Sequence, residues 1–293
     1  MTLPLWLLMA LVAVVVGGVT TVIGRTPPGR EPAVINAARH ARRTSAFAVL
    51  AGLIAALGCG VVCLSLLTGP GVFGRVLLLI PLAAGVAHAV VLALGELAWP
   101  RPGGDIRRAA LVRRGLFDAA PRGLVRAAAA GLGVTVAVLF LGALAADHTG
   151  RTLTVGGLAA RLGPFPGLHY GGPVAAGLLV LVLTTAVALH VVAQRAAVAT
   201  AEPEVETVLR RASAHRVLRG TTAAVLALAA ELLLMVGSTL REAVALTGPA
   251  APAGIGVTGV AVLIAAAVAG AAAVAVACWQ APTVPADGRV SAS

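Results

Sequence analysis

The sequence contains no lysine, since all 22 basic residues are arginine. This absence excludes the lysine Schiff base that holds retinal and similar groups. Charged residues make up only 11% of the chain and aromatic residues 3%, which is far from the composition of a soluble domain. Three cysteines are too few for a secreted disulfide framework. We therefore expect Cys59, Cys63 and Cys278 to be small packing residues.

Apolar residues make up 59% of the 293 residues, and the mean hydropathy is +0.98. At about 20 residues for each crossing of the bilayer, the chain can supply seven or eight membrane spans and little else. The formal charge of +11 would suggest nucleic acid as the partner of a soluble protein. Here the arginines lie between apolar segments, so the lipid bilayer is the expected partner and nucleic acid is not.

Hydropathy predicts an all-α, polytopic membrane protein with seven transmembrane helices. They are expected near residues 3–23, 44–67, 76–99, 127–146, 173–194, 221–240 and 255–279. Eighteen arginines follow the first, third, fifth and seventh helices, and only four follow the others. The positive-inside rule therefore puts the N-terminus outside and the C-terminus inside. The first helix has no basic residue before it, so we expect it to be retained and not cleaved as a signal peptide.

Similar landmarks recur in the same order in the first and last thirds of the chain. Both copies contain the tetrapeptide Leu-Thr-Gly-Pro, at 67–70 and at 246–249, and a tryptophan follows 29 or 30 residues later. A basic run around His40 in one copy corresponds to a basic run around His215 in the other. We therefore expect two parallel three-helix repeats joined by a linking helix. The alternative is that a chain rich in Gly, Pro and Thr repeats a tetrapeptide by chance.

The duplication divides the chain into four parts. The expected parts are repeat 1 (1–102), an amphipathic cytoplasmic segment with the linking helix and an outer loop (103–172), repeat 2 (173–285) and a disordered cytoplasmic tail (286–293).

Four ionisable residues fall inside the expected spans: His88, Glu96, His190 and Glu231. Ionisable groups inside a membrane are costly and often mark an ion or proton path. They form a candidate polar site between the repeats, centred on His88 and Glu231. The alternative is that each is a buried packing residue, bonded to a hydroxyl or a carbonyl of a neighbouring helix.

Arginine pairs alternate with apolar residues between the third and fourth expected spans. The pairs are Arg107 with Arg108 and Arg113 with Arg114. Such a segment is typical of a helix on the membrane surface, and it could bind anionic lipid headgroups or a cytoplasmic or membrane subunit.

Enzyme motifs are missing from the sequence: it has no HExxH, no aspartate within a span, no GxSxG and no phosphate-binding glycine loop. We expect no cofactor and no metal. Haem would require His88 and His190, whose expected depths differ. In the outer loop, Asp147, His148 and His169 lack a regular ligand spacing, and the Gly and Pro residues of 163–173 predict turns and no helix.

The segments ELAWPRP (96–102), RRGLFDAAPR (113–122) and PFPGLHYGGP (164–173) resemble multi-pass integral membrane proteins of streptomycetes and related actinobacteria, a family without an assigned function. The resemblance implies a bacterial cytoplasmic membrane and a seven-helix body, and it provides no substrate or catalytic residue. From the residues themselves we expect a small transporter or a membrane subunit of a transport assembly. A structural or regulatory protein that recruits a partner or anionic lipid is the alternative, and a membrane-embedded enzyme is the third.

Overall fold

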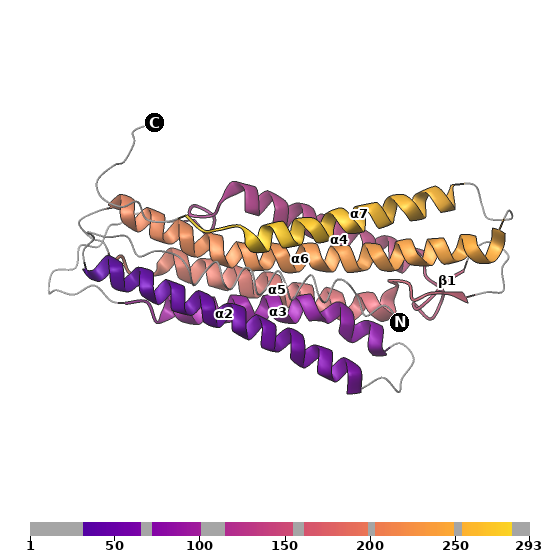
Figure 1. Cartoon of the computed structure of the whole chain (residues 1–293), viewed down its shortest axis with the longest axis horizontal. Helices are drawn as coiled ribbons and strands as arrows, with labels where there is room; N and C mark the ends of the chain where they lie inside the picture. The colour runs from indigo at the N-terminus through magenta and orange to yellow at the C-terminus, as the bar shows by residue number, and fades with distance from the viewer. Residues whose placement is uncertain are drawn as a thin grey trace.

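The computed structural model describes residues 32–65, 72–100, 115–154, 161–198, 203–248 and 254–282. Within these ranges, six helices lie side by side in an elongated bundle (Figure 1). They are α2 (Pro32–Ser65), α3 (Val72–Leu97), α4 (Arg122–Ala145), α5 (Leu168–Gln194), α6 (Pro203–Thr247) and α7 (Ile255–Cys278). All six are long and apolar enough to cross a membrane, which is the architecture of a multi-pass membrane protein. The expected helix at 3–23 lies outside the described residues.

Two helices extend well beyond the expected spans. α2 begins at Pro32, twelve residues before the expected start, and α6 begins at Pro203. Proline is favourable at the first position of a helix, where its missing N–H is not needed. The sequence also predicts a helix over 202–219, acidic at its start, basic at its end and with Glu206 and Arg210 at i,i+4, which runs into the sixth span unless Gly220 separates them. α6 confirms this helix as part of one helix of 45 residues, and Gly220 does not interrupt it. In both helices, turns with charged and polar residues therefore precede the apolar part.

The expectation of turns over 163–173 is wrong from Leu168 onward, because α5 begins there and contains Pro173. Proline has no N–H, so the carbonyl of His169, four residues earlier, loses its helical partner. The Nε–H of Arg75 on α3 donates to that carbonyl at 2.9 Å. A side chain from a neighbouring helix thus replaces the missing bond and allows the helix to begin early.

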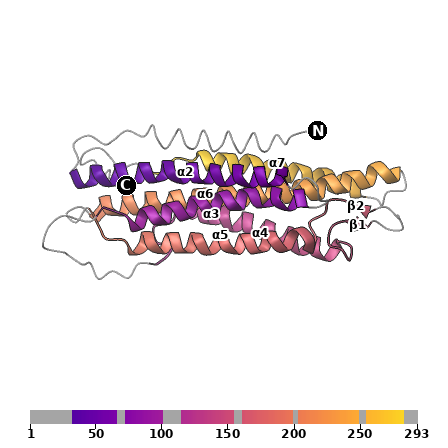
Figure 2. The same cartoon turned by 90° about the horizontal axis from the view of Figure 1, so that it is seen from below.

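A small antiparallel hairpin, which the sequence did not suggest, lies at one end of the bundle (Figure 2). It consists of β1 (Leu153–Thr154) and β2 (Arg161–Leu162). We call this the hairpin end. The opposite end, where Trp99 and Trp279 follow α3 and α7, is called the arginine end.

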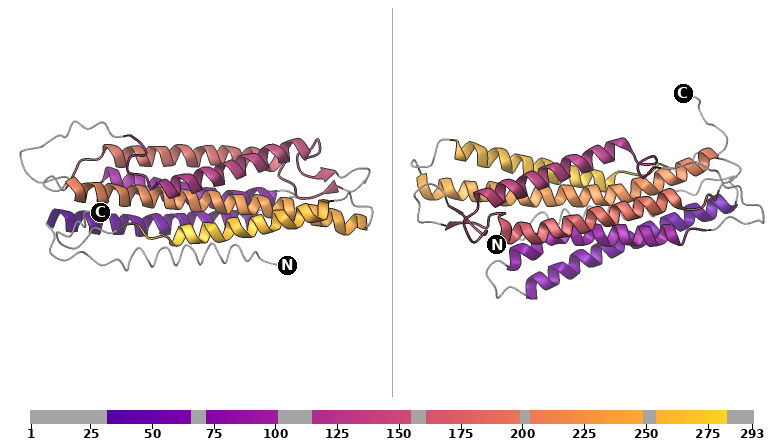
Figure 3. Two further views of the ribbon diagram at one scale, coloured as in Figure 1. Left: turned by 90° about the horizontal axis from the view of Figure 1, so that it is seen from above. Right: turned by 180° about the vertical axis from the view of Figure 1, so that it is seen from behind.

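α6 runs through the middle of the bundle (Figures 1 and 3). The most extensive helix contacts are those of α6 with α7 and of α2 with α3, while α3 also packs on both α5 and α6. Two apolar clusters fill the interior. The cluster at the arginine end includes Leu92, Leu124, Val192 and Val217, and the one at the hairpin end includes Leu82, Val174, Leu181 and Leu228. Both clusters draw residues from α3, α5 and α6.

Large apolar side chains also cover the outer faces of the helices. On α2 they recur at helical spacing and are about half exposed or more: Phe47, Leu50, Ile54, Leu57 and Val61. A soluble protein rarely exposes such a continuous apolar surface. In a bilayer this surface faces acyl chains at no cost.

Candidate functional site: a buried charge network

His88 and Glu231 are far apart in the structure. His88 is buried on α3 against α6, with Nε2 3.4 Å from the carbonyl oxygen of Arg216. Its ring fills the space beside Gly220, where an added Cβ would overlap it. Glu231 lies eleven residues further along α6, which is about 16 Å along a helix axis. The structure therefore does not bring these two residues into one site.

The other two intramembrane residues differ in their surroundings. His190 is exposed on the outer side of α5. Glu96, near the end of α3, is 7% exposed and faces Arg195. Glu231 is half-buried, and its Oε2 has no hydrogen-bond partner among the described residues. Of the four candidates, Glu96 alone belongs to a cluster of charged side chains.

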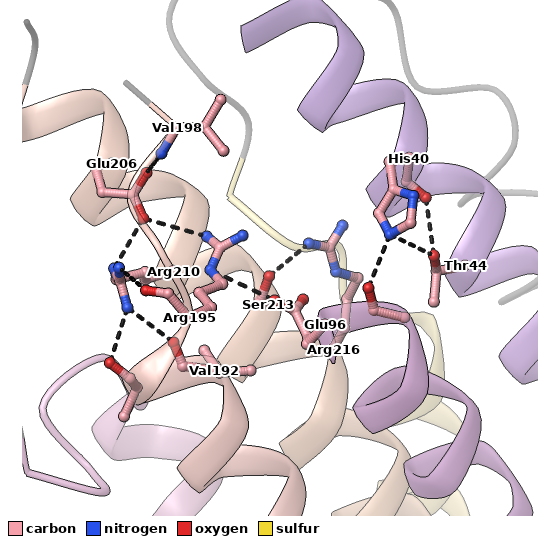
Figure 4. Close-up of polar contacts among 12 residues, drawn as sticks. His40, Thr44, Glu96, Val192, Arg195, Val198, Glu206, Arg210, Ser213 and Arg216 are labelled. Carbon is pink, nitrogen blue, oxygen red and sulfur yellow. Dashed lines mark hydrogen bonds and ion pairs between the residues drawn. The ribbon is translucent and has the colours of Figure 1, made fainter. Parts of the chain in front are cut away.

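That cluster links three segments of the chain at the arginine end (Figure 4). Arg195 Nε lies 3.4 Å from Glu96 Oε2, and Arg195 Nη2 lies 3.6 Å from Glu206 Oε1. Glu206 Oε1 also lies 2.8 Å from the Nε of Arg210, one turn further along α6. The four side chains are between 1% and 8% exposed. We call these residues, Glu96, Arg195, Glu206 and Arg210, the charge network.

Arg195 is the central residue of the network. It caps the C-terminal end of α5, and its Cζ lies 3.6 Å from the centre of the Trp99 ring. The indole face attracts the guanidinium electrostatically, and the N–H groups at the guanidinium edge remain available to the carboxylates. Burial lowers the pKa of Arg195 below its ordinary value, while the charges of Glu96 and Glu206 oppose that shift. The two acidic partners thus favour the charged form of the arginine, against the effect of burial.

Arg210 closes the C-terminal end of α5. Its Nη1 donates to the carbonyls of Val192 and Ala193 at 2.9 Å, and its Nη2 donates to the carbonyl of Arg195 at 2.7 Å. The last carbonyls of a helix lack internal partners and carry partial negative charge, so a cation is favourable there. The backbone N–H of Val198 donates to Glu206 Oε2 at 3.1 Å, which fixes the α5–α6 connection to the same network.

Positive charge exceeds negative charge around the network. Arg216 donates from Nη2 to Ser213 Oγ at 3.1 Å, and Arg219 donates from Nη1 to the carbonyl of Trp279 at 3.2 Å. His215, directly before Arg216, is 3% exposed, and neither ring nitrogen has a partner among the described residues. The arginine end thus holds the two buried carboxylates of the network together with four arginines, Arg195, Arg210, Arg216 and Arg219.

Two histidine–tryptophan pairs lie at this end of the bundle. The rings of His40 and Trp99 meet edge to face with centres 5.6 Å apart, and those of His215 and Trp279 do so at 6.0 Å. Each pair joins the first and second helix of a packed pair, α2 with α3 and α6 with α7. His40 Nε2 also donates to the Gly95 carbonyl at 2.8 Å.

The sequence had indicated only part of this site. It identified Glu96 as an intramembrane acid and the i,i+4 pair Glu206 and Arg210, which the structure confirms as an ion pair. Arg195 was assigned only to topology, as one of many loop arginines. No signal in the sequence showed that a residue between two helices would turn back onto Trp99. Arg107, Arg108, Arg113 and Arg114 lie outside the described residues.

The described residues contain no group of three or more His, Cys, Asp or Glu side chains that could hold a metal ion. Comparison of the chain with protein-family models, with curated protein sequences and with solved structures finds no match.

Proposed function

We propose that this chain is a non-enzymatic integral membrane protein, a small transporter or the membrane subunit of a transport assembly. We place it in a bacterial cytoplasmic membrane, with the arginine end in the cytoplasm. The observation that carries the proposal is the charge network, which joins α3 to α6 and to the C-terminal end of α5 by buried ion pairs at the arginine end of the bundle. A contact of this kind can act as a gate, which means that its breaking opens the helix interface at the arginine end and its formation closes it.

The proposal includes two repeats, in which α2–α3 and α6–α7 are equivalent pairs. The matched His40–Trp99 and His215–Trp279 contacts support it, because these residues correspond in the sequence comparison of the two thirds. The early starts of α2 and α6 support it as well, since both helices extend at the same end. In transporters built from repeats, access alternates by rocking of one repeat against the other.

Buried ion pairs suit a contact that must open and close. Their mutual attraction is largely offset by the cost of removing both charges from water, so their net contribution to stability is small. When the interface opens, water hydrates Glu96 and Arg195 and replaces the lost attraction. The closed and open states can then differ little in free energy, as a two-state transition requires.

Thiol labelling tests the gate. Cys59, Cys63 and Cys278 are replaced by serine, and a single cysteine is introduced as Ala214→Cys, at a position that is 1% exposed near the network. In nanodiscs, a polar maleimide should label this cysteine slowly, and Glu96→Gln should accelerate the labelling at least several-fold. Ala230→Cys, 2% exposed and sixteen residues further along α6, serves as the reference position.

Arg241→Gln is the matched charge control, because Arg241 is exposed near the other end of α6. The gate predicts faster labelling at residue 214 alone and no effect of Arg241→Gln. Unchanged labelling in a folded Glu96→Gln variant contradicts the proposal. Faster labelling at both positions indicates general loosening of the bundle and contradicts it too.

The alternative is a regulatory membrane protein that binds anionic lipid or a partner through arginine-rich segments. One observation favours it: Arg122 and Arg126, at the start of α4, are exposed and follow the arginine pairs at 107–114 within the same connection and helix start. Native mass spectrometry of protein released from nanodiscs of phosphatidylglycerol and phosphatidylcholine tests it. Fewer retained anionic lipids in Arg122→Gln with Arg126→Gln, compared with Arg241→Gln, would support this function.

A further inference from the structure

Three side chains from three elements meet at the hairpin end, far from the charge network. Arg75 comes from the start of α3, Arg151 from the loop before β1, and His169 from the first turn of α5. Arg151 Nε donates to His169 Nδ1 at 3.1 Å, and Arg75 Nη2 contacts the same nitrogen. Arg75 is also held by the bond from its Nε to the His169 carbonyl.

The protonation of His169 follows from these contacts. A ring nitrogen that accepts from a guanidinium carries no proton, so the neutral ring holds its proton on Nε2. That Nε2 is buried and has no hydrogen-bond partner among the described residues. Among the three side chains, His169 Nδ1 is therefore the one acceptor, and the guanidiniums of Arg75 and Arg151 share it. The other side-chain nitrogens are all donors.

No carboxylate among the described residues forms an ion pair with Arg75 or Arg151. Asp147, the acidic residue of the same loop, is occupied within that loop. Its carboxylate accepts from Thr149 Oγ1 at 2.7 and 2.9 Å and from the backbone N–H groups of Arg151 at 3.2 Å and Thr152 at 3.3 Å. Two like charges thus converge on a neutral ring without a counterion from this part of the chain.

We propose that Arg75, Arg151 and His169 form a binding site for an oxyanion of the phosphate type. A phosphate group supplies several acceptor oxygens, matches the planar donors of guanidinium groups and neutralises their repulsion. The exposed Arg151 leaves the site open to water, so free phosphate or the phosphate of a lipid headgroup can reach it.

The same charges exclude the metal site considered for Asp147, His148 and His169. A divalent cation at His169 would lie beside two guanidiniums, and the Asp147 oxygens are already bonded. The ligand expected at the hairpin end is therefore an anion.

The test uses the full chain in nanodiscs of phosphatidylcholine. Inorganic phosphate is titrated against chloride at equal ionic strength, and binding is followed by isothermal titration calorimetry. We expect saturable binding that Arg75→Gln or Arg151→Gln weakens by about tenfold or more, the usual effect of losing a charged hydrogen bond. Arg241→Gln, at the same end of the bundle, should leave the affinity unchanged.

A second arm separates the two sources of phosphate. Native mass spectrometry counts phosphatidylglycerol retained by wild type and by Arg151→Gln in the absence of free phosphate. Retention lost in the variant assigns the site to a lipid headgroup, and phosphate binding without such retention assigns it to a soluble anion. The proposal is overturned if folded wild type binds neither anion, or if Arg241→Gln weakens binding as much as Arg151→Gln does. None of these results depends on the gate.

Discussion

Arg195 lies against Trp99, with 3.6 Å between the guanidinium carbon and the centre of the indole ring. The same guanidinium reaches Glu96 on α3 and Glu206 on α6 from its edge. One side chain thus contacts an aromatic face and two carboxylates, which requires the planar, fixed shape of arginine. Lysine, which this sequence lacks entirely, could not make all three contacts.

Arg195→Met should lower the free energy of unfolding by about 3–5 kcal/mol, because it leaves Glu96 and Glu206 buried without their common partner. Arg195→Lys should cost less, since it keeps the charge and loses only the planar face. Denaturant unfolding in mixed micelles, followed by circular dichroism, measures both. Arg241→Met is the control. If it lowers the free energy of unfolding as much as Arg195→Met does, the charge network does not stabilise the fold.

Trp99→Leu and Trp279→Leu form a matched pair, since each tryptophan follows a helix and meets a histidine edge to face. Only Trp99 also lies under an arginine, and it is 7% exposed where Trp279 is 51% exposed. Trp99→Leu should therefore cost more stability, by about 2 kcal/mol for the desolvated cation–π contact. The same unfolding measurement compares the two variants, and equal losses of unfolding free energy would contradict the role assigned to Arg195.

Gly220→Ala should destabilise the protein by about 1–3 kcal/mol, because the added methyl group would overlap the His88 ring. His88→Ala in the same chain should recover much of that loss, since it vacates the space. Gly133→Ala on α4, where nothing lies within 4 Å, should be neutral or slightly stabilising. Additive effects of Gly220→Ala and His88→Ala would show that these residues do not contact each other.

The loop at Asp147 should loosen in acid. Hydrogen bonds from Thr149, with further ones from Thr152 and Arg151, hold the pKa of Asp147 well below its ordinary value. A carboxyl group with a lowered folded pKa stabilises the loop above the unfolded pKa of about 4, and that contribution fades as the pH falls below it. Amide hydrogen exchange at residues 149–154, corrected for its intrinsic pH dependence, should show falling protection. Asp147→Asn should remove this pH dependence, and an unchanged profile in that variant would contradict it.

Hydropathy predicted the helices well because membrane spans need long apolar runs, and α3, α4 and α7 match their expected bounds within a few residues. It underestimated α2, since the first turns of that helix are polar and gain stability from contacts with other helices, whereas the charge pattern of 202–219 indicated the early start of α6. The start of α5 was predicted wrongly for a related reason. Pro173 disfavours a helix through its immediate neighbours, but Arg75, almost a hundred residues earlier, supplies the hydrogen bond that compensates for it.

The candidate site, too, could be predicted only in part from the sequence. Composition identifies which residues are costly to bury, and Glu96 and Glu231 were found on that ground. It cannot identify partners, because Arg195 reaches Glu96 only through the packing of α5 on α3. His88 and Glu231 were expected at the centre of one site. In the structure, His88 packs on α6 beside Gly220, about three turns before Glu231 on the same helix.

At 45 residues, α6 is about 67 Å long, roughly twice the hydrocarbon thickness of a bilayer. It carries Glu206 near one end, and near the other the Thr239 hydroxyl donates to the Pro164 carbonyl beside the hairpin at 2.9 Å. Because one uninterrupted helix joins the charge network to the hairpin, a tilt of α6 at the arginine end would also displace its contact with Pro164 at the hairpin end.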